Sequence, residues 1–114
     1  MIKWNYLRSV HDLNAVAERS KEIPCLIFKH STRCSISSMA KYRLEDDWNF
    51  DATEIEPYFL DLIAHRDVSN AVASEFQVHH ESPQVLLIRD GECTYDASHL
   101  DITVDELREC YTAS

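Results

Sequence analysis

Cys34 carries the clearest chemical signal in this sequence, where it lies within the segment Phe28–Ser38, FKHSTRCSISS. An apolar run of β type ends just before this cysteine, and a helical pattern begins just after it. The free backbone N–H groups of a helix N-terminus favour negative charge on sulfur, and the thiolate is the reactive form. The sequence therefore predicts a nucleophilic thiol at the junction between a strand and a helix.

Cations and hydroxyl groups lie close to this thiol along the chain. Arg33 is its immediate neighbour, and Lys29 and His30 precede it by a few residues, so positive charge is expected to favour the thiolate. Thr32 and Ser37 carry hydroxyls that could donate a hydrogen bond to the sulfur. The alternative is that the cysteine is a small, buried apolar residue, as free cysteines often are.

Ser37 stands where a Cys-x-x-Cys pair would have its second sulfur. A second thiol at that place resolves a mixed disulfide within the same protein, and a serine has no such chemistry. The cysteine three residues earlier would attack, hold a mixed disulfide and wait for a thiol from another molecule. The alternative for Ser37 is an ordinary residue of the first helical turn.

Three further cysteines are candidates for a distant resolving thiol. Cys25 lies near the start of a predicted strand and is expected in the core, at the sheet edge opposite the reactive thiol. Cys93 falls in a predicted hairpin and Cys110 in the last predicted helix. We expect these thiols to be reduced, because nothing marks the chain as secreted.

His79 and His80 raise the question of a metal site with His30 and Cys34. The spacing matches neither Cys-x-x-Cys nor His-x-x-x-His, which are typical of metal ligands. A solvent-exposed pair of loop histidines is the better interpretation, and no metal is expected.

Ser82-Pro83 precedes an apolar run that predicts a strand. X-Pro bonds have a modest cis population, and a cis proline at a strand entrance usually has a structural purpose. On the residues alone, a trans proline in a loop is the expectation.

Composition excludes several classes of function. The net charge is −9, with 11 basic and 20 acidic residues, which argues against nucleic acid or an anionic membrane as a partner. No apolar run reaches the roughly 18 residues of a membrane span, and the first residues lack the apolar core of a signal peptide. Gly91 is the only glycine, which excludes Gly-rich phosphate loops. We expect a cytoplasmic protein.

Apolar periodicity predicts the elements that must position the thiol. Helical spacing covers residues 11–22, 35–48, 68–77 and 104–112; apolar runs predict strands at 23–29, 58–64, 84–88 and 92–96, with a short strand at 4–7. Asp90-Gly91 is a strong hairpin signal. The alternation predicts one α/β domain over residues 1–114, with a mixed central sheet covered by helices on both faces. The reactive thiol then lies at the carboxyl edge of the sheet, where open α/β folds place their sites.

The helix that follows the thiol has an apolar residue at every fourth position. Ile36, Ala40, Leu44 and Trp48, with Met39 beside them, are expected to form its buried stripe.

Several segments together resemble the signature of the YtxJ-like monothiol bacilliredoxins. Matching stretches are Phe28–Cys34 (FKHSTRC), Ile36-Ser37, His80–Ile88 (HESPQVLLI), Ala97–His99 and Ile102-Thr103. The combination is far more specific than one cysteine at a helix start.

This resemblance implies a thioredoxin-like fold and a role for each matching residue. Cys34 would be the nucleophile, Ser37 would occupy the second-cysteine position, and Pro83 would be a cis proline that faces the thiol. Ser82 would present its backbone to the substrate. One position departs from the family pattern, because Ser35 stands where the family usually has proline. Proline there removes an N–H and stiffens the first helical turn, so its loss is expected to alter the redox poise.

The implied activity is that of a monothiol thiol-disulfide oxidoreductase. It would act on protein mixed disulfides with a low-molecular-weight thiol, which is bacillithiol in the type family, and would need no bound cofactor. A second small thiol or a dithiol protein would be the reductant, and Arg33 would stabilise the thiolate and meet a carboxylate of the small thiol. The alternatives are a non-catalytic interaction or redox-sensing stress module, and an enzyme that reduces peroxide or arsenate.

Overall fold

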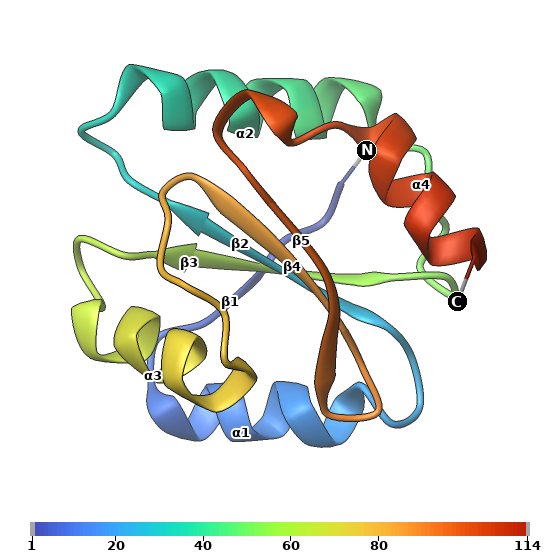
Figure 1. The fold of residues 1–114 in the computed structure, drawn as a ribbon, viewed down its shortest axis with the longest axis horizontal. Coiled ribbons are helices and arrows are strands. Elements are labelled where there is room, and N and C mark those ends of the chain that lie inside the picture. Colours follow the sequence, from blue (N-terminus) through green and yellow to red (C-terminus); the bar gives the residue numbers. More distant parts are fainter. Residues whose placement is uncertain (1, 114) are drawn as a thin grey trace.

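The computed structural model describes residues 2–113, which form a five-stranded sheet between two layers of helices (Figure 1). Along the chain the elements are β1 (Asn5–Tyr6), α1 (Val10–Arg19), β2 (Cys25–His30), α2 (Ser35–Asp47), β3 (Glu56–Asp61), α3 (Arg66–Phe76), β4 (Gln84–Arg89), β5 (Glu92–Ser98), a 3-10 turn (His99–Asp101) and α4 (Val104–Ala113).

The sheet is mixed, with the strand order β1-β3-β2-β4-β5. β1, β3 and β2 run parallel, β4 runs antiparallel to β2, and β5 returns antiparallel to β4. Figure 1 shows α1 and α3 on one face of the sheet and α2 and α4 on the other. The predicted mixed α/β architecture with helices on both faces is therefore confirmed.

β2 is the central strand, and all six of its residues are buried. Cys25 and Ile27 pack with the core beneath α1 and α3, while Leu26 and Phe28 pack with the core beneath α2 and α4. Successive side chains of a strand point to opposite faces, so a strand covered on both sides reads as one apolar run. Burial on both faces fixes the position of β2, and Cys34 lies four residues after the end of this strand.

The expected buried stripe of α2 is wrong in part. Ala40 and Leu44 are buried, but Ile36 and Met39 are 42% and 55% exposed, and Ser37 fills the buried face instead. Residues four apart advance by about 40° around a helix, so a repeat at every fourth position turns away from the core. Positions 37, 40 and 44 alternate steps of three and four and stay on one side.

Strand boundaries also differ from the prediction. β3 begins two residues before the expected segment 58–64 and ends three residues before its close. Asp61 Oδ1 accepts the backbone N–H groups of Ile63 and Ala64 at 3.1 and 3.2 Å, and this Asx turn ends the strand. The hairpin at Asp90 and Gly91 is confirmed, because both residues have positive φ, of 51° and 79°.

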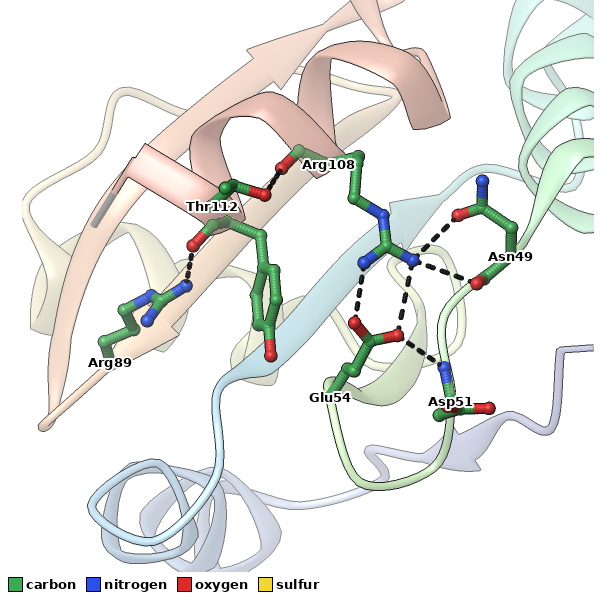
Figure 2. A network of polar contacts seen from close by, with 7 residues as sticks. Asn49, Asp51, Glu54, Arg89, Arg108 and Thr112 are labelled. Carbon is green, nitrogen blue, oxygen red and sulfur yellow. Dashed lines mark hydrogen bonds and ion pairs between the residues drawn. The ribbon is translucent and has the colours of Figure 1, made fainter.

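Arg108 of α4 ties the α2–β3 connection to the rest of the fold (Figure 2). Its guanidinium donates to both carboxylate oxygens of Glu54, at 2.6 and 3.3 Å, and to two oxygens of Asn49. The same group lies 3.9 Å from the centre of the Phe50 ring. The fork of Arg108 thus holds the segment that follows α2, the helix whose N-cap is Cys34.

The helices of the described chain, residues 2–113, are all too short or too polar to cross a bilayer.

Candidate functional site

Cys34 is the N-cap residue of α2. Its backbone is extended (φ −115°, ψ 121°), its N–H donates to the Ser31 carbonyl at 3.2 Å, and its carbonyl accepts from Ser38 at 3.1 Å. The side chain is half-buried and is a free thiol. The sulfur therefore belongs to the residue whose neighbouring N–H groups have no partner in the helix, where negative charge is stabilised.

Of the three residues expected to place positive charge near the thiol, Arg33, Lys29 and His30, only Arg33 is exposed. Arg33 is exposed and forms no ion pair among residues 2–113. Lys29 is fully buried and contacts His80, so it is not a solvent-facing cation beside the sulfur. Burial lowers the pKa of His30, with the charge of Lys41 acting in the same direction, so its ring is neutral at pH 7.

Ser37 holds the loop that leads to the thiol. Its hydroxyl is fully buried, accepts the N–H of Ser31 at 3.0 Å and lies 2.7 Å from His30 Nδ1. Among residues 2–113, neither Ser37 nor Thr32 makes a hydrogen bond to the Cys34 sulfur. Sequence reasoning missed the contacts of Ser37 with Ser31 and His30, because no residue pattern marks a hydrogen bond between a strand end and a helix turn.

Pro83 follows a cis peptide bond with Ser82. The trans state expected from the residues alone is therefore wrong, because tertiary context decides an X-Pro bond whose intrinsic preference is small. Pro83 is buried at the entrance to β4, and its carbonyl accepts the N–H of His99 at 3.0 Å. Lys29 pairs with Gln84, so Ser82 and Pro83 lie at the end of β2 that leads to Cys34.

The other cysteines are placed as core or partly covered thiols. Burial raises the pKa of Cys25 to about 12 and that of Cys93 to about 11. Burial also raises the pKa of Cys110, with Glu106 and Glu109 acting in the same direction. These groups stay protonated near neutrality and are poor nucleophiles.

Sheet register places two of these thiols far from the candidate site. Cys25 opens β2 and pairs with Ile88, which in turn pairs with Cys93. Both sulfurs therefore belong to the end of the sheet opposite the one from which Cys34 emerges. This arrangement gives Cys34 no resolving partner in either of them.

The two loop histidines have separate contacts. His79 Nε2 lies 3.6 Å from Glu81, whereas His80 Nδ1 lies 3.2 Å from Lys29 Nζ. Within residues 2–113, no group of three His, Cys, Asp or Glu side chains is arranged to hold a metal ion. A recess of about 320 Å³, lined by Trp4 and other aromatic residues, lies at the start of β3, at the sheet edge remote from the thiol.

Comparison with known proteins identifies the family and the fold. The family model described as monothiol bacilliredoxin BrxC matches residues 5–107. A solved structure described only as that of an inferred oxidoreductase with a thioredoxin fold is 30% identical, with a TM-score of 0.77 over 92% of this chain and 90% of that chain. Two thioredoxins have a similar fold. That of Malassezia sympodialis is 16% identical, with a TM-score of 0.73 over 97% of this chain and 90% of that chain. That of Fasciola hepatica is 18% identical, with a TM-score of 0.73 over 96% of this chain and 97% of that chain.

The matched region contains every residue of the candidate site, from Thr32 to Pro83. The fold is that of thioredoxin, and the family gives the chain a general thiol-oxidoreductase role. This chain, with its free thiol at the start of α2 and a serine in the second-cysteine position, belongs to the monothiol bacilliredoxin family.

Proposed function

We propose that the protein removes a low-molecular-weight thiol, of which bacillithiol is the leading candidate, from mixed disulfides on client proteins. The observation that carries the proposal is the single thiol at the α2 N-cap, with a buried serine at the position of a resolving thiol. Cys34 supplies the nucleophile, and Ser37 leaves the second step to another molecule.

The first step is attack of the Cys34 thiolate on the small-thiol sulfur of the client disulfide. A new S–S bond forms between Cys34 and the small thiol, the client S–S bond breaks, and the client leaves as a thiolate. A second small thiol then attacks the adduct, releasing the symmetrical small-molecule disulfide and restoring the Cys34 thiolate. A dithiol protein could attack the adduct instead: its first thiol takes the small thiol and frees Cys34, and its second thiol then displaces the small thiol and forms a disulfide within the dithiol protein.

Charge and access support this assignment. Arg33 is exposed and has no carboxylate partner among residues 2–113, so its guanidinium is available to a carboxylate of the small thiol. That local charge offsets a net charge of −9, which repels anions at longer range. Ser82 and Pro83 are proposed to align the client disulfide, and the same role is proposed for Thr32, which is exposed and lies two residues before Cys34.

A turnover assay tests the proposal. The substrate is a small client protein whose one cysteine carries bacillithiol; parallel substrates carry glutathione or cysteine. Cys34→Ala should abolish release of the client thiol, whereas the matched variant Cys110→Ala should react as the wild type does. Equal turnover by Cys34→Ala would rule out catalysis by this thiol and favour a non-catalytic interaction module.

The role of the second-cysteine position is tested separately. Ser37→Cys should give an internal disulfide with Cys34 after one turnover, with release of the small thiol, detected as a loss of two hydrogen atoms (about 2 Da) in the intact mass. The wild type should instead accumulate the small-thiol adduct when no reductant is supplied. An internal disulfide in the wild type would contradict the monothiol route.

A further inference from the structure

Lys29 is a buried cation that the exchange chemistry of Cys34 does not use. Its side chain is 0% exposed, and no carboxylate of residues 2–113 forms an ion pair with it. Its Nζ lies 3.2 Å from Nδ1 of His80, the one hydrogen-bond partner that the described chain offers the ammonium. An apolar side chain of the same length would avoid the penalty of burying this charge, so the charge does not serve stability.

The contact joins the strand of the nucleophile to the segment 79–83, here called the proline loop. Lys29 lies five residues before Cys34 on β2 and its extension, and it pairs with Gln84 of β4. Gln84 Nε2 donates to the carbonyl of the residue before His80, at 3.0 Å, which fixes the same loop from the β4 side. The proline loop is thus held by two contacts, one from Gln84 of β4 and one from Lys29 of β2.

We propose that Lys29 is a positioning residue for disulfide exchange, because its buried ammonium donates to His80 and holds the proline loop where the client disulfide binds. This inference rests on the proposed function. The donated hydrogen bond requires a neutral His80 ring whose proton is on Nε2, which leaves Nδ1 as the acceptor. Removing either partner should leave the reactive thiol intact and displace the loop that aligns its substrate.

Acid should break the contact. Protonation of His80 puts a proton on Nδ1, so this nitrogen can no longer accept a hydrogen bond from the Lys29 ammonium. The other groups that face this ring are Arg66 of α3, which adds repulsion, and His79 and Glu81 of the proline loop, of which only Glu81 is attractive. Ser69 of α3 is a neutral neighbour, with its hydroxyl 3.5 Å from Nδ1. Positive charge therefore predominates around a protonated ring, and the loop should be released.

Two rates measured on the same variants separate loop positioning from thiol reactivity. One is exchange with the bacillithiolated client, and the other is alkylation of Cys34 by iodoacetamide, followed on its peptide by mass spectrometry. Lys29→Met should slow exchange about tenfold, since small misplacements of aligning groups have effects of this order or larger, with alkylation changed less than about twofold. The exposed lysine variant Lys21→Met removes the same charge remote from the loop and should leave both rates unchanged.

The conservative variant His80→Asn tests the hydrogen bond itself. The Asn Oδ1 replaces Nδ1 as an acceptor and does not titrate, so exchange should be retained near pH 7. The ratio of exchange rate to alkylation rate should fall in the wild type as the pH is lowered from about 7 to values at which the His80 ring is protonated, and should stay constant in His80→Asn over the same range. A purely structural role of Lys29 would produce neither the rescue nor the loss of pH dependence.

A third measurement needs no turnover. In ¹⁵N-edited NMR spectra, the His80 ring should have its proton on Nε2 at neutral pH, and Lys29→Met should raise its depressed pKa towards the ordinary value. The proposal is overturned if Lys29→Met slows alkylation as much as exchange, leaves exchange unchanged, or leaves the His80 ring unaffected. If the wild type shows no exchange but the NMR response is present, the proposed function fails and the Lys29–His80 contact stands.

Discussion

Replacing Lys29 with methionine should stabilise the protein, and the gain should depend on pH. Burial lowers the pKa of Lys29 from the ordinary value of 10.5 to about 8. Each tenfold change in the acidity constant is worth about 1.4 kcal/mol, so keeping this ammonium buried costs about 3 kcal/mol. Methionine is one atom shorter than lysine, fills most of the same space and removes the charge, and the exposed His80 ring can turn to water.

The sign of the pH effect follows from proton binding. Between about pH 8 and 10.5 the unfolded chain binds the Lys29 proton more tightly than the folded protein does, so this residue makes stability rise with pH. Its penalty is complete below about pH 8 and disappears above about pH 10.5. Cys25 and Cys93 act oppositely, because their raised pKa values make stability fall as the unfolded thiols ionise. These thiols are present in both proteins, so their effect cancels in a comparison.

Urea unfolding of the wild type and Lys29→Met gives the required difference. The variant should be more stable by up to about 3 kcal/mol at about pH 7, and this advantage should shrink by about 2 kcal/mol at about pH 9.5. Lys21→Met, which removes an exposed ammonium, should show a small difference that does not change over the same range. A constant difference for Lys29→Met, or a loss of stability at every pH, would refute the reasoning from burial.

Other substitutions test the loop, the helix start and the α4 contact. Ser37→Ala should lower the free energy of unfolding by about 1–2 kcal/mol in urea titrations, because the Ser31 N–H loses its buried acceptor; an unchanged midpoint would contradict this. Ser35→Pro should raise the free energy of unfolding by about 0.4–1 kcal/mol, since the first helical residue suits proline; destabilisation would show that this N–H is needed. Arg108→Lys should lower the melting temperature in calorimetry, because lysine cannot form the fork with Glu54; an equal melting temperature would count against it.

Much of the fold could be predicted from short-range patterns. The apolar run before His30 predicted β2, because a strand covered on both faces has no polar alternation. Asp90 and Gly91 predicted the β4–β5 hairpin, because both accept positive φ. In these cases the local sequence and the tertiary structure impose the same conformation.

The parts that could not be predicted depend on contacts between distant residues. Periodicity placed Lys29 on a strand but could not tell that its ammonium reaches a loop 51 residues later. The buried face of α2 was assigned to Ile36, whereas the fold uses Ser37 there, because a hydroxyl can join the end of β2 to the helix start. The isomer of Pro83 is likewise decided by its surroundings.

The most direct test of the account is a single-turnover reaction between the wild-type protein and the bacillithiolated client, without reductant, followed by peptide mass spectrometry. The account predicts one small thiol attached to the peptide that contains Cys34, free Cys25, Cys93 and Cys110, and an equal amount of reduced client. A client that stays modified, or a small thiol attached to any other cysteine, would contradict the claim that Cys34 is the exchanging thiol.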